Sequence, residues 1–165
     1  MRATRILRHL LLPSFVARRR FGPAVLAKIE HAIGAVEAHH AGEIRFAVET
    51  ALDGARLWRN RSPRDCAIDA FSHLRVWDTQ HDNGILIYVL LADRDVEIVA
   101  DRAIAARVSQ TEWDAVCRTM EEHFREGRFA EGGVAGVEGV GRLLAQHFPR
   151  SGGDRNELPD RPVLL

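Results

Sequence analysis

Short apolar runs with two different patterns mark the strands of this chain. Residues 43–49 alternate, with Ile44, Phe46 and Val48 on one side and polar or small residues on the other, which predicts a strand with one protected face. Residues 85–91 form a continuous apolar run after Asn83-Gly84, as is typical of a central strand covered on both faces. The strand pattern resumes at 96–100 after a short polar turn, so we expect an antiparallel hairpin.

Helical spacing of apolar residues connects and follows these strands. A helix is expected from Pro23 to about Gly42, with an apolar stripe formed by Leu26, Ile29, Ile33 and Val36. Ser62-Pro63 begins a second helix, whose apolar side is expected to include Ile68, Phe71 and Leu74. Ser109 and Glu112 form a capping box for a third helix. A fourth, glycine-rich helix is expected at about 129–148, and its glycines indicate close backbone packing.

These elements predict an α/β protein. Helices on both sides of a small sheet make a three-layer α/β/α sandwich. The sheet is expected to be mixed, since it combines a parallel crossover with an antiparallel hairpin. We divide the 165 residues into a basic amphipathic arm (1–22), one α/β domain (23–149) and a polar C-terminal tail (150–165) that folds back or stays loose.

Charge is distributed unevenly along the chain. Lys+Arg and Asp+Glu both total 23, but residues 1–22 contain six arginines and no acidic residue, so the rest of the chain is acidic. The arm also has helical apolar spacing. Its apolar positions are Ile6, Leu7, Leu10, Leu11, Phe15 and Val16, opposite Arg5, Arg8 and His9. We expect the arm to dock on the protein's own acidic surface, with contact between residues 1–20 and a membrane surface as the alternative. Nucleic acid is not an expected partner.

The expected compartment is a reducing one. Only two cysteines, Cys66 and Cys117, are present, and they fall on two different predicted helices, so a disulfide framework is not expected. The apolar run Leu10-Leu11-Leu12 is ended by Pro13 and is too short for a membrane span. We therefore expect a soluble, cytoplasmic domain, peripheral to the membrane if the arm binds lipid.

Several motifs occur in an order that resembles a known family. They are Val76-Trp77-Asp78, Asn83-Gly84 leading into the apolar strand, the turn Asp93-Arg94-Asp95, and the segment 124–130. Together they resemble the TPM domain (phosphatase-like) family over about Leu26 to Phe148. The resemblance implies an α/β/α sandwich, divalent-cation binding in some members and acid-phosphatase activity claimed for a few plastid relatives. The chain departs from the family at 100–104, where the family has a glycine-rich, glutamate-bearing stretch.

Two groups of side chains could form a site. The first is the loop before the central strand together with the end of the hairpin, and it comprises Asp78, His81, Asp82, Asn83, Asp101 and Arg102. Carboxylates with one imidazole suit calcium, magnesium or manganese, and Asp78, His81, Asp82 and Asp101 are the expected ligands. The rival group lies at the other end of the sheet, the usual ligand side of an open α/β sheet. It comprises Glu49, Thr50, Asp53, Asp93 and Asp95.

Three functions follow from these alternatives. The leading hypothesis is a TPM-like domain that binds a divalent cation and serves as an accessory or interaction module for a protein partner. The second is a metal-assisted acid-phosphatase-like hydrolase, in which the cation polarises a phosphoryl oxygen. The third is a membrane-surface adaptor that uses the arginine-rich arm.

Overall fold

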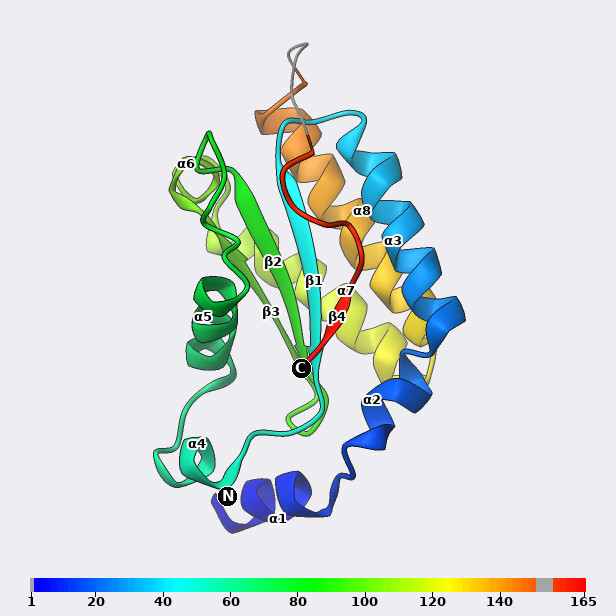
Figure 1. Ribbon diagram of the computed structural model, residues 1–165, viewed down its shortest axis with the longest axis vertical. Helices are drawn as coiled ribbons and strands as arrows, with labels where there is room; N and C mark the ends of the chain where they lie inside the picture. Colours follow the sequence, from blue (N-terminus) through cyan, green and yellow to red (C-terminus); the bar gives the residue numbers. More distant parts are fainter. Residues whose placement is uncertain (1, 151–155) are drawn as a thin grey trace.

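The computed structural model describes residues 2–150 and 156–165. The helices are α1 (Arg2–Leu11), α2 (Phe15–Arg20), α3 (Pro23–Glu37), α4 (Gly54–Trp58), α5 (Pro63–His73), α6 (Arg102–Ala105), α7 (Gln110–Arg125) and α8 (Phe129–His147). The strands are β1 (Glu43–Glu49), β2 (Gly84–Leu90), β3 (Asp95–Ala100) and β4 (Val163–Leu164). Figure 1 shows helices on both sides of a central sheet, so the expected α/β/α sandwich is confirmed.

The sheet is mixed, as the sequence predicts. Its strand order is β3-β2-β1-β4. β1 pairs in parallel with β2, and α4 and α5 form the connection between them. β2 pairs with β3 as an antiparallel hairpin. Every residue of β2 is buried, because both faces of this central strand are covered by other layers.

One face of the sheet is covered by α3, α7 and α8. Ile44, Phe46 and Val48 of β1 point into this core, together with alternate residues of β2 and β3. Glycines let α8 approach its neighbours closely: a Cβ on Gly136 would lie 2.2 Å from Met120 Sδ of α7, and one on Gly133 would lie 2.5 Å from Ile29 Cδ1 of α3. The expected close packing of the glycine-rich helix is therefore confirmed, and its physical reason is backbone approach on two sides.

The other face is covered by α5 and by the C-terminal segment. α5 buries Cys66, Ala67, Ala70 and Phe71, whereas Ile68 is exposed. The expectation that Ile68 faces the core was wrong, because positions 66, 67, 70 and 71 form the buried face of α5 and Ile68 lies beside that face. Both cysteines are free and buried.

The C-terminal segment corrects the expectation that β1 has only one protected face. All seven residues of β1 are buried, including its charged ones. Glu43 accepts hydrogen bonds of 3.0 Å from the backbone N–H groups of Glu157 and Leu158, and Arg45 donates to the carbonyl oxygen of Arg161 at 3.0 Å. Segment 156–165 therefore crosses the polar face of β1 and ends as β4, while residues 151–155 of the tail lie outside the described residues.

Candidate functional sites at the two ends of the sheet

The loop before β2 carries the first group of predicted ligands. Asp78 is exposed and accepts a hydrogen bond of 2.5 Å from Arg75. His81 is exposed as well. Asp82 has a φ of 51°, and its carboxylate lies 3.2 Å from the Arg102 guanidinium. Two of the three carboxylates expected in this group to bind a cation are thus paired with arginine at the surface.

Asn83 and Asp101 are the buried members of the same group. Asn83 donates from its side-chain amide to the carbonyl oxygen of Ala41. Asp101 caps α6 by accepting from the backbone N–H of Arg102 at 2.6 Å. Within residues 2–150 and 156–165, one oxygen of each side chain, Asn83 Oδ1 and Asp101 Oδ2, is buried without a hydrogen-bond partner. Such oxygens are costly unless a cation, a water or another donor satisfies them.

The predicted metal ligands do not gather into one cluster. Within residues 2–150 and 156–165, no group of three or more His, Cys, Asp and Glu side chains is arranged to hold a metal ion. The hairpin does bring Asp101 and Arg102 back to the Asp82 end of the sheet, since the Ala103 N–H donates to the Asp82 carbonyl oxygen at 3.3 Å. Asp78, Asp82 and Asp101 therefore lie at the same end of the sheet, but each carboxylate contacts a different partner.

The opposite end of the sheet, where β1 and β2 finish, is occupied by the N-terminal helix. Arg5 of α1 donates from Nε to both carboxylate oxygens of Asp93 at 3.0 Å, and from Nη2 to Asp93 Oδ2 at 2.8 Å. Burial opposes ionisation of Asp93, but the contacts with Arg5 and His9 outweigh it and lower the pKa of that carboxyl group. α1 is therefore fastened to the hairpin turn by a part-buried ion pair.

His9 completes this attachment from the next turn of α1. Its Nδ1 accepts a hydrogen bond of 2.9 Å from the backbone N–H of Leu52. A neutral ring then carries its proton on Nε2, which lies 3.1 Å from Asp93 Oδ1, although the alignment is too poor for a regular hydrogen bond. The spacing of Arg5 and His9 at i and i+4 was visible in the sequence, but their partner was not.

Three more of the residues predicted at this end, Glu49, Thr50 and Asp53, are also engaged. Glu49 pairs with Arg56 and accepts from the Tyr88 hydroxyl. Asp53 caps α4 by accepting from the Arg56 N–H at 2.9 Å. Thr50 donates to the carbonyl oxygen of Ser14 at 3.3 Å. These contacts tie the segment after β1 to the N-terminal helices and pair Glu49 and Asp53 with Arg56.

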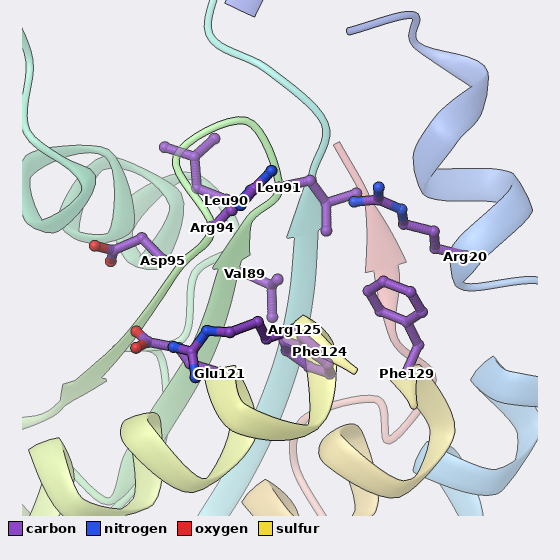
Figure 2. A pocket seen from close by; sticks show the side chains of 10 residues that line it. All are labelled: Arg20, Val89, Leu90, Leu91, Arg94, Asp95, Glu121, Phe124, Arg125 and Phe129. Carbon is purple, nitrogen blue, oxygen red and sulfur yellow. The ribbon is translucent and has the colours of Figure 1, made fainter. Parts of the chain in front are cut away.

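Asp95 differs from its neighbour Asp93 because it has no arginine partner in the part of the chain that the structure describes. Burial, together with the nearby carboxylates of Glu97, Glu121 and Asp93, raises the pKa of the Asp95 carboxyl group to about 7. Asp95 lines a cavity of about 190 Å³ beside the hairpin turn, which is shown in Figure 2. Sequence reasoning placed Asp95 at this end but did not foresee the cavity, which needs side chains from α2 and α7.

The outer side of α1 carries large apolar side chains. Leu7, Leu10 and Leu11 are 54%, 70% and 69% exposed, and Phe15 at the start of α2 is 59% exposed. Leu7 and Leu11 lie two residues before and after His9, and therefore project about 160° away from it around the helix axis. We call Leu7, Leu10, Leu11 and Phe15 the leucine stripe. No helix among the described residues has the length and apolar character needed to cross a membrane.

The layers and the strand order define the class of protein: a small α/β/α domain built around a four-stranded mixed sheet. The chain belongs to the TPM domain family, whose sequence profile matches residues 17–143. The resemblance inferred from the sequence motifs is thus confirmed.

Two solved structures resemble the chain. One is the NMR structure of the BA42 protein from the psychrophilic bacterium Bizionia argentinensis, with 32% identity and a TM-score of 0.75, covering 86% of this chain and 93% of that one. The other is the N-terminal domain of a protein from P. gingivalis, with 18% identity and a TM-score of 0.61, covering 85% and 94%. This second likeness concerns the fold alone. No curated protein matches the sequence.

Proposed function

We propose that this TPM domain is a non-enzymatic module that attaches to an anionic membrane surface through the leucine stripe. The observation that carries the proposal is the orientation of α1: its polar side is bound to the protein through Arg5 and His9, so that its apolar side faces solvent. Leu7, Leu10 and Leu11 are neighbours on the solvent-facing surface of the helix. An exposed apolar patch of this kind is typical of a binding surface.

The charges around the stripe favour lipid with anionic headgroups. Arg8, Arg18 and Arg19 are exposed, and none of them forms a salt bridge within residues 2–150 and 156–165. Residues 1–22 contain no acidic side chain to repel phosphate groups. Apolar side chains on one side and arginines beside them are the features of helices that lie in the membrane interface.

An exposed tryptophan lies at the same end of the molecule. Trp58, in α4, is 86% exposed. α1 runs beside this segment, because His9 accepts from Leu52 and Arg5 donates to the Arg61 carbonyl oxygen at 2.8 Å; Figure 1 shows α1 and α4 together at that end. Tryptophan is enriched at the membrane–water interface, so Trp58 extends the proposed contact surface beyond α1.

The size of the stripe suits reversible attachment. Removing one such side chain fully from water stabilises binding by roughly 1.5–3 kcal/mol. Each arginine near an anionic surface adds about 1 kcal/mol. Because partial insertion and lost freedom reduce the sum, we expect binding that is sensitive to salt and to lipid charge.

The test is sedimentation of the full chain with vesicles of phosphatidylcholine, with and without phosphatidylglycerol. We expect binding to the anionic vesicles only, and loss of binding in a Leu10→Gln/Leu11→Gln variant. Ile68→Gln is the matched control, since Ile68 is an exposed apolar residue on α5 and its replacement should leave binding unchanged. Equal binding of the double variant and the natural chain contradicts the proposal. So does self-association through the stripe, seen as a dimer that the double variant lacks.

A divalent cation at the Asp101 end is the second candidate. It is favoured by the two buried oxygens without partners, Asn83 Oδ1 and Asp101 Oδ2, which are hard donors of the kind that calcium, magnesium and manganese prefer. Asp82 would join them by giving up Arg102, and Asp78 and His81 would have to move inward from their exposed positions. A metal-assisted phosphatase would require the same cation to polarise a phosphoryl oxygen.

Cation binding and phosphatase activity can be tested with the same variant. We expect millimolar calcium or magnesium to raise the melting temperature of the natural chain but not that of Asp101→Asn. Phosphate release from phenyl phosphate that depends on the cation and on Asp101 would favour the enzyme over the binding module. If no cation shifts the melting temperature, the cation proposal fails, whereas the membrane proposal is unaffected.

A further inference from the structure

A groove runs between α3 and α8 on their solvent-facing side. It has a volume of about 490 Å³, and its apolar lining consists of Ala27, Ala32 and Ala35 of α3 and Val134 of α8. Ala27 and Ala35 are exposed, so no other element within residues 2–150 and 156–165 covers the groove. An apolar groove between two helices is suited to receive the face of another helix.

One residue of each formal charge lines this groove, Lys28 on α3 and Glu138 on α8. Both are exposed, and neither forms a salt bridge within the ranges 2–150 and 156–165. A partner with a single sign of charge would pair with one of these residues and be repelled by the other. A partner that pairs both must present one positive and one negative group at the matching spacing.

The alignment of the two helices determines where these charges lie. Figure 1 shows α3 and α8 side by side. Gly133 lies against Ile29 and Gly141 lies against Val36, so the two helices run parallel to each other. By this alignment, Glu138 is level with about position 34 of α3.

The two charges are therefore placed symmetrically about the middle of the groove. Lys28 lies roughly 9 Å along the helix axis from the level of Glu138, at 1.5 Å per residue. His31, which also lines the groove, lies halfway between the two levels. A rotation by 180° about an axis that crosses the groove at His31 exchanges these levels, so that Lys28 of each copy meets Glu138 of the other. Such mutual pairing is the geometry of a two-fold symmetric dimer.

We propose that the groove between α3 and α8 is the contact surface between two copies of this chain. The apolar lining is buried in the contact, and the two Lys28–Glu138 pairs fix its register. α3 has 15 residues and is about 22 Å long. The contact area is therefore small, and we expect a weak dimer with a Kd on the order of 0.1 mM. The groove shares no residue with the leucine stripe, so the dimer is independent of the proposed membrane attachment.

The test is sedimentation equilibrium of the full chain. Lys28→Glu and Glu138→Lys should each weaken dimerisation by about tenfold or more, because both symmetric pairs become repulsive. The exchanged variant Lys28→Glu/Glu138→Lys should restore the natural affinity to within about threefold, a recovery that a folding defect would not show. Glu122→Lys is the matched control, since Glu122 is an exposed residue of α7 outside the groove, and its replacement should leave the affinity unchanged.

Chemical cross-linking gives a second readout, because Lys28 is the only lysine of the chain. A carbodiimide, which joins an amine directly to a carboxylate, should produce a covalent dimer in which mass spectrometry finds Lys28 linked to Glu138. Lys28→Arg keeps the charge but has no amine, so it should still form the dimer and lose the cross-link.

Three results would overturn the assignment. The first is a natural chain that remains monomeric at about 1 mM, which would leave the groove to a different protein partner. The second is equal affinity of Lys28→Glu and Glu122→Lys, or an exchanged variant as weak as the single ones. The third concerns Leu10→Gln/Leu11→Gln, which should lose vesicle binding but still dimerise. If that variant is monomeric, the dimer contact lies at the leucine stripe instead.

Discussion

The helices α1 and α8 are attached to the same sheet by opposite means. α8 is packed by its glycines, which bring its backbone against Met120 of α7 and Ile29 of α3. α1 is attached by Arg5 and His9, which contact Asp93 and the Leu52 N–H. The apolar side of α8 is therefore buried, whereas the apolar side of α1 faces water.

This difference separates stability from interaction. Contacts that bury apolar surface at close range belong to the cooperative core, and their loss unfolds the whole domain. Contacts made by a few polar side chains at one end can open locally while the core remains folded. We therefore expect α8 to determine whether the domain folds, and α1 to determine what the folded domain presents to a partner.

Gly136→Val is the largest expected perturbation. A Cβ at this position would lie 2.2 Å from Met120 Sδ and 2.8 Å from Met120 Cγ, and Met120 is fully buried. We expect the free energy of unfolding to fall by about 3 kcal/mol, measured by urea denaturation. Gly54→Ala is the control, since its Cβ would have nothing within 4 Å. A similar loss in both variants would show that close packing of α8 is not the cause.

Arg5→Gln is expected to have a smaller and local effect. It removes the ion pair with Asp93 and the bond to the Arg61 carbonyl oxygen. We expect faster amide exchange throughout α1, while the free energy of global unfolding changes by about 1 kcal/mol or less because α1 opens by itself. Arg8→Gln, an exposed position on the same helix, should leave exchange unchanged. Faster exchange in β2 as well would mean that α1 belongs to the cooperative core.

Asp95 gives the smallest effect, and it appears in the pH dependence of stability. Its pKa is raised from 3.8 to about 7 in the folded protein, so the folded state binds a proton that the unfolded state lacks between these values. This contribution is present at low pH and is lost as pH rises through 7. Asp95→Asn should therefore raise the melting temperature more at pH 8 than at pH 5.

The control for this pH experiment is Glu122→Gln, an exposed residue of α7, which should shift both melting temperatures equally. Asp93 has the opposite sign, because its lowered pKa gives stability that is lost as pH falls. A larger gain for Asp95→Asn at pH 5 than at pH 8 would contradict the assigned direction.

Local patterns were sufficient for most of the fold. The apolar runs identified β1, β2 and β3, and the capping box at Ser109 and Glu112 marks the start of α7 as expected. β4 was missed because it has only two residues, and it depends on Glu43 and Arg45, which hold the segment before it from more than a hundred positions away. Such polar anchors have no local signature.

The candidate sites depended even more on distant contacts. Helical spacing showed that the arm is amphipathic, but not which side docks, because Arg5 and Asp93 are 88 positions apart. The expected gathering of Asp78 and Asp101 rested on sheet geometry, which correctly places Asp82 and Asp101 at one end but cannot predict that Arg75 and Arg102 take up the carboxylates of Asp78 and Asp82. The cavity beside the hairpin turn is lined by residues of α2, the turn and α7 together, so no single segment of the sequence indicates it.

The central claim is that α1 binds the protein by its polar side and offers Leu11 to an anionic membrane. An environment-sensitive fluorophore on Leu11→Cys tests it directly, because the two natural cysteines are buried. The emission should shift to the blue with phosphatidylglycerol vesicles, and not with neutral ones, while the same label on Glu122→Cys stays unchanged. No shift at position 11, or an equal shift at both positions, would contradict the claim.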